Sequence, residues 1–280
     1  MSILITSDST CDLTAQQLEA HNIKICPLVV VKNGQAFRDG TEITPDEIYA
    51  HVAEGGDLCS TAALNVSDYT DFFGKYVSEY DAIIHLNLSS HFSSCHQNAK
   101  LAAMDYENVY VVDSLNLSTG HGLLVLCAAE MAEAGKEAEE IVDTLNALTA
   151  KVRASFVLDQ LEYMRKGGRC STVAALGANL LKLKPSIEVR DGKMGVAKKY
   201  RGSLEKCLKE YVAEQLADLQ SIEPHRIFIT HSGVDQSILD MVKALVEETG
   251  YFEEICVSRA GCTVSCHCGP GTLGVLFIEK

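Results

Sequence analysis

Hydroxyl and carboxylate side chains gather in three loops, each directly after a short apolar run and before a helical stretch. Helix N-termini offer unpaired backbone N–H groups and the positive end of the helix dipole, so anions are favoured at such loops. The same residue types are the ordinary caps of helices, so each loop taken alone is also consistent with capping. The loops are Ser7-Asp8-Ser9-Thr10, Ser89-Ser90-His91-Phe92-Ser93 and Asp113-Ser114.

Two further polar residues stand beside glycine turns. Arg169 follows Gly167-Gly168, a pair that permits a tight turn, and its planar guanidinium suits a carboxylate or a phosphate. A solvated charge on a glycine turn is the alternative interpretation. His267 lies just before the turn Gly269-Pro270-Gly271, and histidine titrates near neutrality and can donate to a carboxylate. Thr61 precedes a helix that we expect Ser67 to cap, and on its own it indicates no function.

Eleven cysteines raise the question of disulfides or metal. The number is odd and the chain is not small, so we predict reduced cysteines that fill apolar space. Cys262, Cys266, His267 and Cys268 are a conceivable ligand set, but neighbours in sequence cannot easily share one tetrahedral centre, so we predict no metal site. A thiol-dependent redox or metal protein is a third-ranked hypothesis.

Strands and helices alternate through the first half of the chain, which predicts a parallel sheet covered by helices. The carboxyl ends of parallel strands meet at one edge, so the three polar loops should lie together there. The expected strands are Ile3–Thr6, Ala82–Leu88 and Val109–Val112, with helices ending near Leu18, near Met104 and at Glu133, the last beginning at Ser118. Thr44-Pro45-Asp46-Glu47 carries the residues of a capping box and should begin another helix.

A different pattern begins near Lys151. Ile187 and Val189 face Met194 and Val196 across Asp191-Gly192, which predicts a hairpin. We expect strands at Ile227–Thr230, Ile255–Val257 and Thr272–Ile278, a helix at Val234–Glu248 and another from a Ser171 cap to Leu183. The sequence therefore predicts an α/β protein of two closely packed domains. Residues 1–150 form a parallel sheet with helices on both faces, and residues 151–280 form a mixed α/β domain.

The charge of the chain is distributed unevenly. The net charge is −14, which argues against nucleic acid as a general partner. Between Arg165 and Lys209, however, twelve of the 24 basic residues stand against three acids. This basic segment predicts docking to an acidic surface or attraction of an anion. Arg201 lies beside Gly202, just before a helix that Ser203 should cap, and we expect it to be exposed.

Composition and the first residues favour a soluble protein. Apolar residues make up 47% and charged residues 22%, as in ordinary globular domains. Gly122–Ala129, the longest nearly apolar stretch, is too short to span a bilayer, so we predict no integral membrane segment. Met1 leads directly into Ile3-Leu4-Ile5 without a basic leader or cleavage site. We therefore expect a cytoplasmic location.

Six pieces of the chain together resemble the DegV family, which includes the fatty-acid-binding subunit of bacterial fatty acid kinase. They occur in the order found in that family and extend over essentially the whole chain. The pieces are Thr6-Ser7-Asp8-Ser9-Thr10-Cys11-Asp12-Leu13, Leu88-Ser89-Ser90-His91-Phe92-Ser93, Val112-Asp113-Ser114, Gly167-Gly168-Arg169, Lys184-Pro185 and His267-Cys268-Gly269-Pro270-Gly271.

The resemblance implies a DegV-like fold with a fatty acid in a tunnel between or beneath the domains. It implies that Thr61 and Ser93 hydrogen-bond the carboxylate and that His267 supports it. The loops add Ser90 and Ser114 as candidates. By the same resemblance, Arg169 and Arg201 lie near the carboxylate opening and on the surface that faces a kinase.

The leading hypothesis is a lipid-binding carrier rather than an enzyme, with a long-chain fatty acid as ligand and no cofactor. As the resemblance implies, the catalytic subunit of a fatty acid kinase would phosphorylate the bound acid to an acyl phosphate for phospholipid synthesis. The alternative is a phosphate-handling enzyme, either a phosphohydrolase or a small-molecule kinase, that uses the same loops. Against it, the chain has no Gly-Lys-Ser/Thr phosphate loop, and Asp8 and Asp113 are isolated carboxylates.

Overall fold

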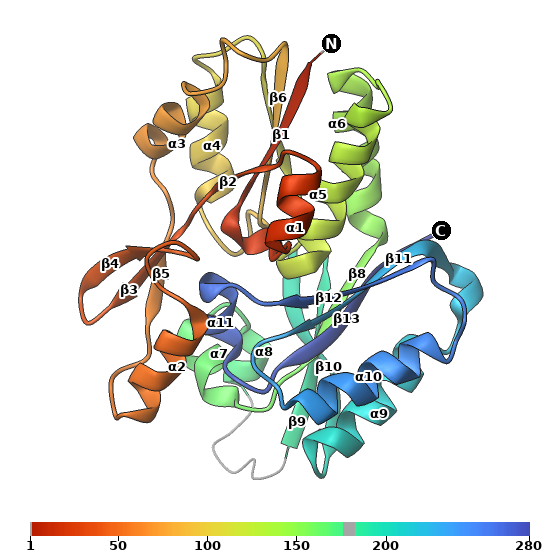
Figure 1. Ribbon diagram of the computed structural model, residues 1–280. Coiled ribbons are helices and arrows are strands. Elements are labelled where there is room, and N and C mark those ends of the chain that lie inside the picture. The colour runs from red at the N-terminus through yellow and green to blue at the C-terminus, as the bar shows by residue number, and fades with distance from the viewer. Residues whose placement is uncertain (1, 176–182) are drawn as a thin grey trace.

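A four-stranded parallel sheet forms the core of the first half of the chain (Figure 1). The computed structural model describes residues 2–175 and 183–280. The strand order is β2-β1-β6-β7, and all three pairings are parallel. Three of these strands match the predicted runs to within two residues at their ends, so the prediction of a parallel sheet is confirmed. The strands are β1 Ile3–Asp8, β2 Lys24–Cys26, β6 Ala82–Asn87 and β7 Val109–Asp113.

Helices cover both faces of this sheet, as predicted. Because side chains of a strand point to alternate faces, a sheet covered twice needs apolar residues at successive positions, and every residue of β6 is buried. α3 and α4 pack in one apolar cluster, while α5 and α6 pack in another with Ile84 and Leu86. The helices are α1 Ala15–Ala20, α3 Val66–Phe73, α4 Cys95–Ala103, α5 Ser118–Glu133 and α6 Ala138–Leu148.

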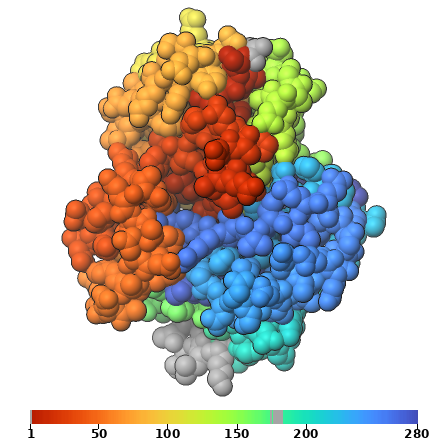
Figure 2. All heavy atoms as spheres, viewed as in Figure 1, coloured from red at the N-terminus to blue at the C-terminus, as the bar shows by residue number. Residues whose placement is uncertain are grey.

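A small antiparallel sheet and one helix project from this layer toward the second half of the chain (Figures 1 and 2). The sheet, of order β4-β3-β5, was not predicted. Thr44 and Glu47 form the predicted capping box at the start of the helix, whereas Asn65, not Ser67, caps α3. The elements are β3 Val29–Lys32, β4 Gln35–Arg38, β5 Ser60–Ala62 and α2 Pro45–Ala53.

The second half builds a six-stranded mixed sheet of order β10-β9-β8-β13-β11-β12. The predicted hairpin is confirmed, since Val189 pairs with Met194 and Ile187 with Val196. Asp191 and Gly192 at its turn both have positive φ, 49° and 75°, as a two-residue turn of this hand requires. The strands are β8 Val152–Val157, β9 Leu183–Arg190, β10 Lys193–Arg201, β11 Ile222–His231, β12 Glu254–Arg259 and β13 Leu273–Glu279.

Five helices accompany the described part of this sheet. Ser203 caps α9 as predicted. The predicted helix from Ser171 to Leu183 is wrong at both ends, because Cys170 precedes the helix and Leu183 already begins β9. Its residues 176–182 lie outside the described residues. The helices are α7 Leu161–Gly167, α8 Ser171–Ala174, α9 Leu204–Gln215, α10 Gln236–Glu247 and α11 Cys262–Cys268.

The cysteines occupy apolar space. All eleven are free, and all but Cys127 are buried. Within the described ranges, no helix has both the length and the hydrophobicity needed to cross a bilayer. The division of the chain at residues 150 and 151 stays a prediction.

Candidate binding cavity

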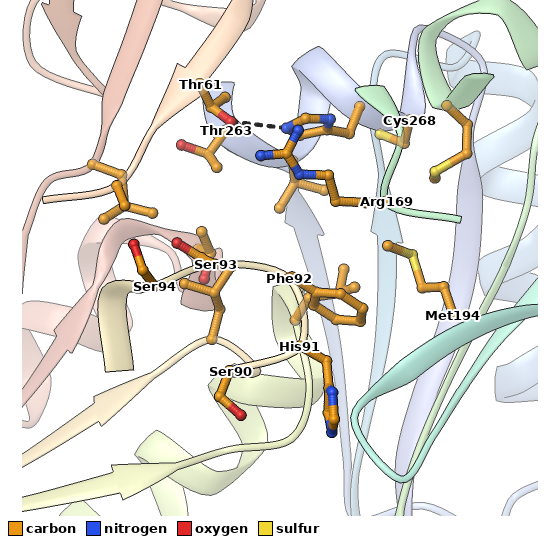
Figure 3. Close-up of a pocket in the computed structure, with 18 of the residues that line it drawn as sticks. Thr61, Ser90, His91, Phe92, Ser93, Ser94, Arg169, Met194, Thr263 and Cys268 are labelled. Carbon is orange, nitrogen blue, oxygen red and sulfur yellow. Dashed lines mark hydrogen bonds between the residues drawn. The ribbon is translucent and has the colours of Figure 1, made fainter. Parts of the chain in front are cut away.

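A cavity of about 490 Å³ lies where loops of the N-terminal sheet, the small sheet and the second half meet (Figure 3). This volume is in the range of small-molecule sites. Thr61, Thr263, Arg169 and His267 form a polar group on one side, and the remaining polar lining residues come from the N-terminal sheet's loops: Thr10, Ser90, His91, Ser93 and Ser94. The apolar wall includes Leu88, Phe92, Leu117, Phe156, Met164, Met194, Val264 and Cys268.

The structure brings Thr61 and His267 together on the polar side. Thr61, in the middle of β5, and His267, near the end of α11, share a 2.9 Å hydrogen bond between Oγ1 and Nε2. The ring fits because residue 167 is glycine, where a Cβ would stand 2.3 Å from His267 Nδ1. Burial, and then the charge of Arg169, lower the pKa of His267 to about 4. The imidazole is therefore neutral at pH 7.

The polar loop after β6 contributes Ser90 and Ser93 to the lining. The Ser93 Oγ accepts a 3.2 Å bond from the backbone N–H of Cys95, at the first residue of α4. The Ser90 N–H is directed at the carboxylate of Asp113, 3.2 Å away. Ser89 donates to the carbonyl of Gly192 in the β9–β10 turn at 2.8 Å. This loop is thus held from the N-terminal sheet and from the second half at once.

Two buried acids of the N-terminal half fix the start of α11. Asp39 accepts hydrogen bonds from the N–H groups of Cys262, at 2.8 Å, and Thr263, at 3.0 Å. Asp12 accepts one from the N–H of Gly261 at 2.8 Å and one from the Ser118 hydroxyl at 2.5 Å. Burial raises the pKa of Asp12 to about 8. Since α11 carries His267, these acids position the polar side of the cavity, a role that we did not predict.

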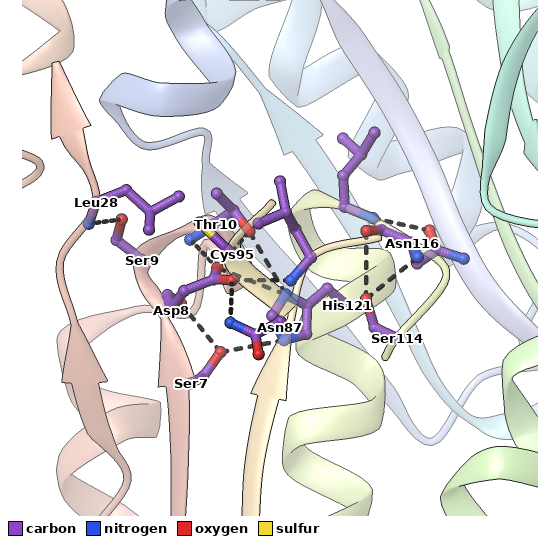
Figure 4. A network of polar contacts seen from close by, with 12 residues as sticks. Ser7, Asp8, Ser9, Thr10, Leu28, Asn87, Cys95, Ser114, Asn116 and His121 are labelled. Atoms are coloured by element: carbon purple, nitrogen blue, oxygen red, sulfur yellow. Dashed lines mark hydrogen bonds and ion pairs between the residues drawn. The ribbon is translucent and has the colours of Figure 1, made fainter. Parts of the chain in front are cut away.

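A second polar network lies beneath the loops (Figure 4). Asp8 is fully buried and accepts from the Thr10 N–H at 3.0 Å, the Thr10 hydroxyl at 2.6 Å and the Leu88 N–H at 2.8 Å. His121 approaches the same carboxylate at 3.9 Å. Asp8 therefore ties the loop after β1 to the loop after β6. Its carboxylate is not presented to the cavity, which weakens the case for a phosphate-handling enzyme built on it.

Two predicted site residues lie away from the cavity. The Ser114 hydroxyl is buried and is used locally, donating to the Asn116 carbonyl at 3.2 Å and accepting from the Asn116 N–H. Arg201 is exposed at the end of β10 and does not line the cavity. Arg169 does line it, and Arg169 also donates to the Gly167 carbonyl at 2.7 Å.

The cysteines near α11 do not form a metal centre in the part of the chain that the structure describes. No three His, Cys, Asp or Glu side chains there are grouped to hold an ion. Burial raises the pKa of Cys268 to about 12 and that of Cys262 and Cys266 further, so these thiols stay protonated. Protonated thiols are poor nucleophiles and poor metal ligands.

Comparison with known proteins decides the family. The model of the DegV family, described as uncharacterised, matches residues 2–280. The chain belongs to the DegV family. A DegV domain-containing protein of Clostridium acetobutylicum is 32% identical to it over 280 residues, covering 99% of each chain.

Solved structures confirm the DegV-like α/β fold. A DegV family protein of Thermus thermophilus, described by its fatty acid binding, matches with a TM-score of 0.93 at 30% identity and covers 100% of both chains. A stearic-acid-binding protein of Eubacterium ventriosum matches with a TM-score of 0.85 at 27% identity, covering 99% of this chain and 98% of its own.

Proposed function

We propose that this DegV protein is a carrier that binds a long-chain fatty acid in the 490 Å³ cavity. The observation that carries the proposal is a cavity with the Thr61–His267 hydrogen bond on one side and an extensive apolar wall beside it. The fatty acid binding described for the relative from Thermus thermophilus, which the chain matches along its whole length, supports the same ligand class.

The carboxylate binds on the polar side of the cavity. A buried carboxylate is costly unless donors surround it. With its proton on Nε2, the neutral His267 donates to Thr61 Oγ1, and this tautomer leaves the Thr61 hydroxyl proton free to point toward the ligand. The Ser93 hydroxyl donates to the Cys95 sulfur at 3.1 Å without ligand and turns to donate to the carboxylate when the acid binds. Ser90 lies three residues earlier in the same loop. The positive charge of Arg169 at the rim attracts the acid and offsets its charge.

The acyl tail supplies most of the binding free energy. Transfer of each methylene from water to an apolar wall contributes about 0.8 kcal/mol, before the cost of immobilising the ligand is subtracted. The walls of the cavity include methionines 164 and 194, whose flexible thioethers fill irregular space beside a ligand. The tail therefore provides affinity, and the polar side sets its orientation.

The carrier presents the bound carboxylate to a partner kinase, which forms the acyl phosphate. Its own loops supply no phosphate-transfer machinery, since the Asp8 carboxylate is buried and already accepts four hydrogen bonds. The partner approaches the exposed basic surface that includes Arg201, at the end of β10. Charge complementarity on such a surface favours an acidic partner.

Titration of lipid-free protein with stearate and with its methyl ester tests the proposal. The carrier binds stearate much more tightly, because the ester lacks the charge that the hydroxyls and Arg169 recognise. Equal affinity for both ligands would contradict the assigned carboxylate site. Phosphatase or ATPase turnover that disappears in Asp8→Asn would instead favour the phosphate-handling alternative.

A further inference from the structure

A second, smaller cavity lies behind the apolar wall of the first. Its volume is about 30 Å³, and it is lined by the end of β11, the start of β13, the start of α5, residues of α11 and Phe156 of β8. Five of its twelve lining residues are polar: Ser118, Thr230, His231, Ser232 and Thr272. The two cavities share four lining residues: Leu117, Phe156, Val264 and Cys268. These four side chains therefore form the wall between the two spaces.

The carboxylate-binding residues do not reach the smaller cavity. Thr61, Ser93, Arg169 and His267 all line the larger cavity, and none of them lines the smaller one. A ligand whose carboxylate is held at Thr61 therefore meets this wall with its apolar part. The smaller cavity lies on the other side of this wall.

Phe156 has the bulkiest side chain of the wall. Its partner on the neighbouring strand is a glycine, which leaves space beside the Phe156 ring. Phe156 on β8 pairs directly with Gly274 on β13, and directly paired residues of antiparallel strands point to the same face. A Cβ on Gly274 would stand 2.8 Å from the Phe156 Cβ and 2.2 Å from the Ser155 carbonyl oxygen. Gly274 itself lines the smaller cavity. The missing side chain at 274 thus makes room both for the Phe156 ring and for the space beside it.

We propose that Phe156 sets the upper length of the fatty acid by closing the smaller cavity to the tail. The inference rests on the proposed function. Straight-chain acids gain affinity with each methylene until the terminal methyl group reaches Phe156, and longer acids gain nothing. Removal of the ring joins the two cavities, so the gain continues for longer acids at about fourfold per methylene.

The dependence of binding affinity on the length of the fatty acid tests this proposal. Lipid-free wild type and Phe156→Ala are titrated with straight-chain saturated acids of increasing length that compete with a fluorescent fatty acid. We expect the wild-type affinity to reach a plateau, and the plateau of Phe156→Ala to move to longer acids. Circular dichroism verifies that each variant is folded. If Phe156→Ala does not fold, Phe156→Leu, which keeps an apolar side chain, replaces it, and we expect a smaller shift of the plateau in the same direction.

Ala260→Val tests whether the acyl tail enters the smaller cavity in Phe156→Ala. Ala260 is buried and lines the smaller cavity but not the larger. Added to Phe156→Ala, this substitution refills the smaller cavity and returns the plateau toward the wild-type length. An unchanged plateau in Phe156→Ala, or a shift that persists in the double variant, would overturn the proposal. Wild-type protein that binds no acid of any length would instead refute the carrier function, and the role of Phe156 with it.

Discussion

Thr61 and His267 are separated by 206 positions in the chain, yet their side chains meet at 2.9 Å on the wall of the cavity. Thr61 belongs to a three-residue strand of the small sheet, and His267 to a helix of the second half. Because each residue comes from a different half, the polar side of the cavity exists only when the two halves are packed together.

Removal of the Thr61 hydroxyl weakens fatty acid binding. Thr61→Ala loses a hydrogen bond to a charged group, which contributes about 1.5–3 kcal/mol, and we expect the same size of loss for Ser93→Ala. Titration with stearate measures the change in dissociation constant. Thr61→Ser keeps the hydroxyl and retains most of the affinity. If Thr61→Ala and Ser93→Ala bind as tightly as wild type, neither residue belongs to the site.

The exposed basic surface serves the kinase rather than the lipid. Arg201→Ala keeps the wild-type affinity for fatty acid, because residue 201 does not line the cavity, but lowers the rate of kinase-coupled phosphorylation. Lys136→Ala, which removes an exposed lysine outside the basic segment Arg165–Lys209, is the control and leaves that rate unchanged. Parallel loss of lipid binding and phosphorylation in Arg201→Ala would refute a docking role.

Asp39 stabilises the protein and holds α11 in place. Asp39→Ala leaves the N–H groups of Cys262 and Thr263 buried without an acceptor, which lowers the free energy of unfolding by about 1–3 kcal/mol for each group. Affinity for stearate falls as well, since α11 carries His267. Asp46→Ala is the control, because the exposed Asp46 pairs with Arg259 at the surface and should cost at most about 1 kcal/mol. Equal unfolding midpoints for the two variants would show that Asp39 has no such role.

Acid should destabilise the fold through two neutral histidines. Burial lowers the pKa of His85 to about 3, with smaller contributions from His121 and His96, and lowers that of His267 to about 4, from 6.5. At these two histidines the unfolded chain binds more protons between pH 6.5 and about 4, so their contribution to the free energy of unfolding falls as the pH falls through that window. Asp12, with its pKa raised to about 8, contributes with the opposite sign in the same window, so the comparison of wild type with a histidine variant isolates the histidine share.

Urea denaturation between pH 7 and pH 5 measures this dependence. Each histidine contributes a slope of at most about 1.4 kcal/mol per pH unit. His85→Gln, which does not titrate, removes the share of His85 and gives a shallower curve. Superimposable pH dependences of wild type and His85→Gln would contradict the assignment.

The regular elements were predictable because local patterns specify them. β1, β6 and β7 are short apolar runs before polar loops, and the Asp191-Gly192 turn specifies its own hairpin. Local chemistry also misled us at two helix starts. Ser171, predicted as a cap, is already the first residue of α8. Asn65 and Asp68 form a capping box before α3, and we chose the nearby Ser67, which has a similar side chain, instead.

The residues that hold the site were harder to predict because their partners are far away in the chain. Asp39 accepts from the start of a helix that lies 223 positions later in the chain. Asp12 and its partner Gly261 are separated by 249 positions. No spacing rule in the sequence connects either acid with its partner. β5 is three residues long and shows no periodicity that would identify Thr61. Conversely, Ser114 satisfies every local criterion of an anion loop, but its hydroxyl is bound within its own turn.

Mass spectrometry of an organic extract of the purified protein tests the central claim most directly. The account predicts about one long-chain fatty acid per protein molecule, and stoichiometric uptake of stearate after the native lipid has been removed. Protein that carries no acyl chain, and takes up none when stearate is offered, would contradict it.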